Sequence, residues 1–86
     1  MINQNSNPVA WALLLCELDE AREHLSELIN EMSRAGSIED STFAVDLGHI
    51  YAHLNRVWHA HDQNHEMSEE QRITFSQFPV DLDPTG

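Results

Sequence analysis

Residues 8–35, PVAWALLLCELDEAREHLSELINEMSRA, decide the fold, because their apolar positions recur at alternating spacings of three and four. Asn7 and Pro8 stand in the order of an N-cap and a first helical position. No proline or glycine follows until Gly36, a common residue just beyond a helix end. The pattern predicts one helix over residues 8–35, about 40 Å long.

A second helical pattern covers residues 40–63, with Gly48 as its one weak helix former. Glu39 is the expected N-cap, and Ser37 with Asp40 is a competing cap arrangement. The connection between the two patterns is only a few residues long, so the helices are expected to be antiparallel neighbours. The predicted fold class is therefore all-α, built on a long antiparallel helical hairpin.

Both helices repeat apolar residues at the a and d positions of a heptad, the pattern that pairs helices. We expect the hairpin to close along this seam. Its members in the first helix are Trp11, Leu14, Leu18, Ala21, Leu25, Leu28, Met32 and Ala35. Its members in the second helix are Phe43, Leu47, Ile50, Leu54, Val57 and His61.

One flank of the predicted seam is apolar and aromatic. A lone hairpin leaves such a stripe in water, so a second copy is expected to cover it and form a homodimeric four-helix bundle. The alternative is a monomer whose stripe is covered by Phe75 and Phe78 of its own C-terminal segment. The predicted interface residues are Trp11, Leu15, Ile29, Ala44, Tyr51 and Trp58.

The other flank is acidic and carries histidines. The register places His24 opposite His53, with His49 and Glu20 within reach. The histidines His24, His49 and His53 are therefore a candidate site for a divalent metal such as Zn²⁺. The alternative is an ordinary solvated helix surface with glutamate–histidine pairs.

The C-terminal part differs in character. Ser68 and Gln71 form a capping-box pattern, which predicts a short helix through about Gln77 followed by an extended tail from Pro79 onward. The expected division is a disordered N-terminus over 1–7, the hairpin over 8–64, and the short helix with its tail over 65–86. The apolar tail residues should pack on the hairpin, or else bind a partner protein: Phe75, Phe78, Val80 and Leu82.

The charge limits the possible partners. Fifteen acidic residues stand against four basic ones, for a formal net charge of −11. This balance argues against nucleic acid and against an acidic membrane surface, and it favours a basic protein as any hetero-partner. An acidic mimic of nucleic acid that inhibits a basic partner is a further alternative. The single Cys16 fits a cytoplasmic protein, and the apolar run 9–16 is too short to span a bilayer.

No pattern for catalysis is present in the sequence. Cys16 lies among carboxylates, which raise the pKa of a thiol and make it less nucleophilic. There is no glycine-rich phosphate loop and no CxxC pair. We expect no enzymatic activity and no cofactor. The predicted function is a small acidic protein–protein interaction module, with a metal- or pH-responsive bundle built on His24, His49 and His53 as the alternative.

Overall fold

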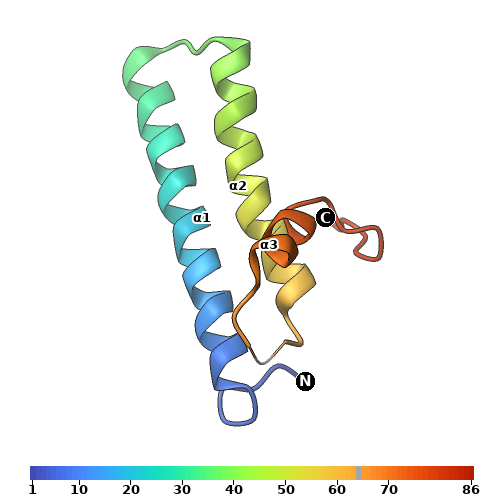
Figure 1. The fold of residues 1–86 in the computed structure, drawn as a ribbon. Coiled ribbons are helices and arrows are strands. Elements are labelled where there is room, and N and C mark those ends of the chain that lie inside the picture. The colour runs from blue at the N-terminus through green and yellow to red at the C-terminus, as the bar shows by residue number, and fades with distance from the viewer. Residues whose placement is uncertain (64) are drawn as a thin grey trace.

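The structure, a computed structural model, describes residues 1–63 and 65–86. It contains the helices α1 (Pro8–Ala35), α2 (Asp40–Ala60) and α3 (Glu69–Phe75). Helices α1 and α2 lie side by side and antiparallel, and α3 packs on α2 near its C-terminal end (Figure 1). The predicted all-α helical hairpin is confirmed. Among the described residues, no helix combines the length and hydropathy needed to cross a membrane.

The first helix has the predicted limits because its end signals are local. Pro8 occupies the start, where its missing N–H is not needed. At the other end Gly36 adopts a left-handed conformation with φ of +72°, and its N–H donates to the carbonyl of Met32 at 2.9 Å. This contact satisfies a carbonyl that the last helical turn leaves free.

The second helix begins after Glu39, as predicted, but it ends at Ala60 rather than at Gln63. The next two hydrogen bonds join residues three apart: the N–H of His61 donates to Trp58 and that of Gln63 donates to Ala60. Such bonds tighten the last turn and end the α-helix. The predicted domain limit at Asn64 lies outside the described residues, and the disordered N-terminus stays a prediction.

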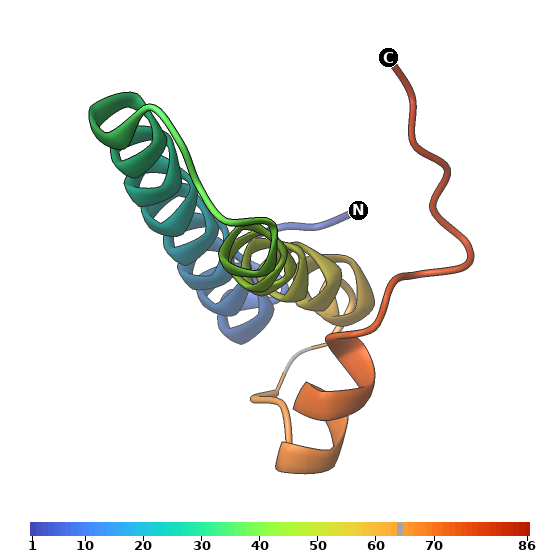
Figure 2. The same cartoon turned by 90° about the horizontal axis from the view of Figure 1, so that it is seen from above.

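The third helix confirms the capping box. Ser68 Oγ accepts from the N–H of Gln71 at 3.1 Å, and Gln71 Oε1 accepts from the N–H of Ser68 at 3.0 Å. The helix ends at Phe75, two residues before the predicted end. The chain beyond it is extended and runs past one side of α2 (Figure 2).

The predicted seam is only partly correct: Leu14, Ala21 and Leu28 of α1 and Ile50 of α2 are buried as predicted, but other seam residues are exposed. Leu18 and Leu25, expected in the seam, are each 44% exposed, whereas Glu17, expected on the solvated flank, is only 6% exposed. Burial of a carboxylate is possible here because it has a buried partner, described below. The buried residues of α1 are Ala10, Leu14, Glu17, Ala21 and Leu28.

Helix α2 likewise turns part of its predicted polar flank toward α1 and part of its predicted seam toward solvent. Leu54 of the predicted seam is exposed, while His53 and Ala60 of the expected polar flank are buried. Two further polar residues of α2 are covered by the segment after α3. Asn55 Nδ2 donates to the carbonyl of Ser76 at 2.8 Å, and Arg56 Nη1 donates to Ser76 Oγ at 2.7 Å.

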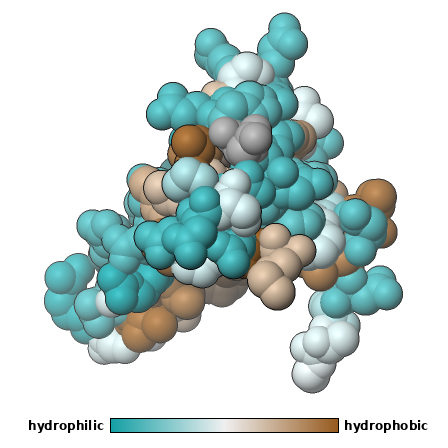
Figure 3. Space-filling model, turned by 90° about the horizontal axis from the view of Figure 1, so that it is seen from below, coloured by the Kyte–Doolittle hydropathy of each residue, from teal (hydrophilic) through white to brown (hydrophobic). Residues whose placement is uncertain are grey.

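The C-terminal tail packs on its own hairpin only in part. The ring of Phe75 stacks on His59, and the ring of Phe78 meets Tyr51 edge-on with centroids 5.2 Å apart. Trp58 Nε1 donates to Asp81 Oδ1 at 2.9 Å. Val80 is fully exposed, and hydrophobic patches break the hydrophilic surface seen from below (Figure 3).

The two glycines of the hairpin give opposite predictions for the same substitution. We expect Gly36→Ala to lower the free energy of unfolding by about 1 kcal/mol, because alanine is strained at positive φ. We expect Gly48→Ala to raise it by about 0.5–1 kcal/mol, since its added Cβ meets no atom within 4 Å and alanine favours a helix. Urea unfolding at one fixed protein concentration measures both. Equal signs for the two variants would contradict this account of α1 and α2.

Candidate functional site

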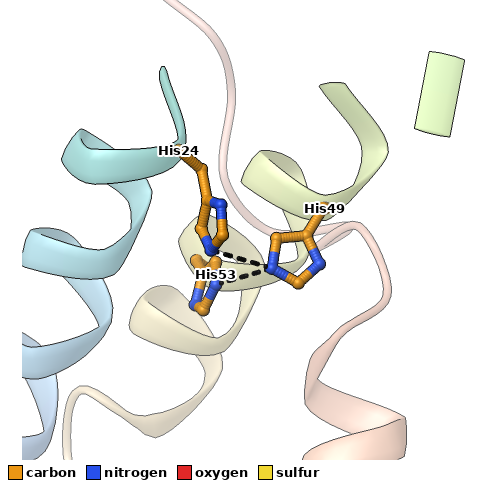
Figure 4. Close-up of side chains that lie close together, drawn as sticks. All are labelled: His24, His49 and His53. Atoms are coloured by element: carbon orange, nitrogen blue, oxygen red, sulfur yellow. Dashed lines mark hydrogen bonds between the residues drawn. The ribbon is translucent and has the colours of Figure 1, made fainter. Parts of the chain in front are cut away.

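Three histidine rings converge between the two long helices (Figure 4). His24 comes from α1, and His49 and His53 come from α2, one helical turn apart. His49 Nε2 lies 3.1 Å from His24 Nε2 and 3.2 Å from His53 Nε2. The rings of His24 and His53 stack with centroids 5.4 Å apart, which confirms their predicted opposition. We call these three residues the histidine cluster.

The histidine cluster runs from the protein interior to its surface. His53 is buried, His24 is half-buried, and His49 is exposed. A hollow of about 320 Å³ opens beside the outer two rings. Its lining is His24, Glu27, Leu28, Glu31, Val45, Asp46 and His49. An ion or small ligand from solution can therefore reach the cluster from one side, where three carboxylates lie.

Carboxylates of α1 lie near the Nδ1 atoms of His53 and His24, on the opposite side of each ring from Nε2. His53 Nδ1 is 3.4 Å from Glu17 Oε2 and 3.3 Å from Glu20 Oε2, and His24 Nδ1 is 3.8 Å from Glu27 Oε2. The sequence predicted that Glu20 would converge with the histidines on one ion. Instead, Glu20 Oε2 lies on the Nδ1 side of His53, where Glu17, Glu20 and His53 form a second group of possible ligand atoms.

A buried ion pair that sequence reasoning missed supports the cluster. Arg56 Nε donates to Glu17 Oε2 at 2.7 Å, and both side chains are almost fully buried. Arg56 Nη2 also lies 3.0 Å from His53 Nδ1. A sequence signal for this pair does exist. Arg56 is the only arginine of α2, so any carboxylate of α1 buried against α2 has one permanently charged partner.

Burial lowers the pKa of His53 below its usual value, because the surroundings disfavour the charged ring. The negative charge of Glu17 opposes this effect, whereas the positive charge of Arg56 adds to it. The net direction is downward. His53 is therefore neutral at neutral pH, with one ring nitrogen carrying a lone pair, and Arg56 Nη2 is positioned to donate to Nδ1.

Cys16 behaves as predicted from its neighbours. Its Sγ donates to Glu20 Oε1 at 3.6 Å, and this hydrogen bond is the main cause that raises the pKa of the thiol. The charge of Glu20 and of neighbouring carboxylates acts in the same direction. The exposed thiol is therefore protonated and poorly nucleophilic at neutral pH.

The side of the hairpin away from the carboxylates is apolar. Leu15 and Ile29 of the predicted interface are 53% and 54% exposed; Tyr51 and Ala44 are also exposed, while both tryptophans are half-buried. A hollow of about 460 Å³ at the α1 N-terminal end of this side is lined by Ile2, Trp11, Leu14, Leu15, Leu18, Leu54, Val57, Trp58, His61 and Leu82. Phe78 touches Tyr51, but Phe75 lies on His59. The tail therefore leaves most of this side in contact with water.

We compared the chain with protein-family models, with curated proteins and with solved structures, and none of them gave a significant match. The class of protein is therefore defined by the fold and the site alone. It is a helical hairpin with a histidine cluster on one side and an exposed apolar side.

The Glu17–Arg56 pair predicts a specific pattern of stability changes. Glu17→Leu should lower the free energy of unfolding by about 3–5 kcal/mol, because it leaves the buried guanidinium without its counter-charge. The double variant Glu17→Leu/Arg56→Leu should recover much of this loss, since neither buried charge remains. Urea unfolding measures each variant.

The matched control is Glu31→Leu, which removes a carboxylate from an exposed pair with Arg34. It should change stability little, as exposed ion pairs usually do. A double variant less stable than Glu17→Leu would contradict the interpretation of a mutually dependent buried pair.

Proposed function

We propose that the chain is a protein–protein interaction module whose partner is a second copy of itself, joined through the apolar side of the hairpin as a four-helix bundle. The observation that carries the proposal is the large exposed apolar area on both long helices. We call this area the apolar face. It consists of Trp11, Leu15, Leu18, Leu25, Ile29 and Met32 of α1, and Phe43, Leu47, Tyr51, Leu54 and Trp58 of α2.

The exposed area supports the need for a partner. The chain exposes 6476 Å², whereas a compact monomer of its mass is expected to expose about 5,200 Å². Its radius of gyration is 14.7 Å, against about 12 Å for a compact chain of this length. The extended tail contributes to the excess, and so does the apolar face. The surplus of about 1,300 Å² exceeds the roughly 800 Å² that each partner buries in a standard interface.

The interior of a single chain is correspondingly thin. Its buried hydrophobic residues are Ala10, Leu14, Ala21, Leu28, Ile50 and Ala60, and half of these are alanines. Among the described residues, no large side chain is completely buried. A small domain of this kind usually needs an additional source of stability, such as oligomerisation or a metal ion.

The arrangement of the apolar face suits a second copy better than an unrelated partner. Along α1 its positions are nearly symmetrical about Arg22, with Leu15 and Ile29 seven residues to either side. A two-fold axis near Arg22 would bring Leu15 of one copy to Ile29 of the other, and Leu18 to Leu25. Such self-complementarity is what a two-fold interface requires.

Electrostatics also favours this side. Two chains of charge −11 repel each other unless their acidic surfaces face apart. The carboxylates of Glu27, Glu31 and Asp46 line the hollow on the histidine side, whereas the hollow on the apolar side has almost no polar lining. A two-fold axis near Arg22 would bring the Arg22 side chains of the two copies close together, and each is paired with its own Asp19.

The test is sedimentation equilibrium of the full chain over a wide range of concentrations. We expect the wild type to have twice the mass of one chain and Ile29→Glu to have the mass of one chain, because a carboxylate buried in the interface would be unpaired. The matched control is Val45→Glu, which charges an even more exposed apolar residue (70%, against 54% for Ile29) on the histidine side. It should remain dimeric.

Two results would contradict the proposal. One is a wild-type chain that sediments as a monomer at every concentration. The other is an equal loss of association in Ile29→Glu and Val45→Glu, which would mean that no particular side is used.

A further inference from the structure

We propose that His24, His49 and His53 of one chain bind a single Zn²⁺ ion through their Nε2 atoms. The site joins α1 to α2 across the middle of the hairpin. All three ligands come from the same chain, so the site does not depend on the proposed dimer. The ligand chemistry is that of neutral imidazole, which suits Zn²⁺ and related first-row ions.

The distances between the ligand atoms fit a tetrahedral ion. Zinc–nitrogen bonds of about 2.0–2.1 Å with tetrahedral angles place two ligand nitrogens about 3.3 Å apart. The Nε2 atom of His49 lies 3.1 Å from that of His24 and 3.2 Å from that of His53. All three residues offer a ligand atom within 4.8 Å of the others, so rotation of the His24 and His53 side chains toward His49 would bring the three rings onto one ion.

The orientation of the rings supports the same ion. In metal sites, a ligating histidine usually donates its second N–H to a carboxylate or carbonyl, which fixes the tautomer and strengthens the ligand. His53 Nδ1 faces Glu17 and Glu20, and His24 Nδ1 faces Glu27. Two of the three ligands thus have a carboxylate at the nitrogen opposite the ligating one, contributed by α1.

Hydrogen bonds among the three rings cannot satisfy all three Nε2 atoms when His24 and His53 carry their protons on Nδ1. If the carboxylates hold protons on Nδ1 of His24 and His53, both Nε2 lone pairs point at His49. His49 Nε2 can donate one proton to only one of them. If the protons move to Nε2, the Nδ1 lone pairs turn toward carboxylates instead. Arg56 Nη2 then provides a donor for His53. A divalent ion accepts all three Nε2 lone pairs at once. His24 Nδ1–H then faces Glu27, and His53 Nδ1–H faces Glu17 and Glu20 after Arg56 Nη2, a donor 3.0 Å from that nitrogen in this structure, has shifted away.

The charge around the cluster also favours a cation. Arg56 is paired with Glu17, so the negative charge of Glu20 beside His53 is not balanced by that pair. Glu27 adds a further negative charge beside His24. Three protein ligands leave the fourth tetrahedral position for water. The hollow of about 320 Å³ lined by His24 and His49 gives that position access to solvent.

The experiment is a titration of the chelator-treated full chain with Zn²⁺ in competition with a chromophoric chelator. We expect one ion per chain, and we expect His49→Ala to weaken binding by more than about 100-fold because it removes a direct ligand. Its control is His65→Ala, which removes another exposed histidine, outside the cluster, and should leave the affinity unchanged. His49 is exposed, so its replacement should not prevent folding.

A second pair of variants tests the orienting carboxylate. Glu20→Gln should weaken Zn²⁺ binding by about 10-fold, since the carboxylate no longer orients His53. Glu23→Gln makes the same charge change on the exposed surface of α1 and should leave affinity unchanged. Long-range ¹H–¹⁵N spectra of the histidine rings should show Nδ1–H tautomers for His24 and His53 in the Zn²⁺-bound protein.

Three results would overturn the proposal: a stoichiometry other than one ion per chain, equal effects of His49→Ala and His65→Ala, or equal effects of Glu20→Gln and Glu23→Gln. The last two would mean that Zn²⁺ binds the acidic surface in general. Repeating the titration on Ile29→Glu separates this site from self-association. One ion per chain is expected in that variant as well, because the ligands lie away from the apolar face.

Discussion

The buried contact between Glu17 and Arg56 sets how the two long helices face each other. A carboxylate and a guanidinium can be buried only where each satisfies the other, and here Glu17 Oε2 and Arg56 Nε are 2.7 Å apart. Glu17 must therefore point from α1 toward α2. Leu18 and Leu25 consequently turn away from α2, while His24 turns toward His53. One ion pair thus accounts for both the exposed apolar side and the histidine cluster.

The helix limits were predictable because their signals are local. Pro8, Gly36 and the Ser68–Gln71 capping box act within a few residues of the helix ends, so neighbouring sequence is enough to place them. The end of α2 was placed three residues too late because no proline or glycine marks it. Bonds from His61 and Gln63 to carbonyls three residues earlier end the helix instead.

The seam could not be predicted in the same way. A heptad pattern identifies the apolar side of a helix, but it does not say whether that side meets the partner helix of the hairpin or another surface. The prediction that placed Leu18, Leu25 and Leu54 in the hairpin seam assumed that the apolar side meets the partner helix. The opposition of His24 and His53 was predicted correctly even so. It depends on the register of the antiparallel pair, which the short connection between the helices determines, and the small rotation of both helices leaves it intact.

The histidine cluster and the apolar face both offer a way to compensate for the low stability of a single folded chain. One chain buries few hydrophobic residues, so the isolated folded hairpin is expected to have a small free energy of unfolding. Anything that binds the folded chain and not the unfolded one increases the folded fraction. A Zn²⁺ ion held by both helices would do so from the histidine side, and a second copy would do so from the apolar face. The two events share the folded hairpin as their common reactant. If the free chain is partly unfolded, each event would raise the apparent affinity of the other without any contact between the two sides.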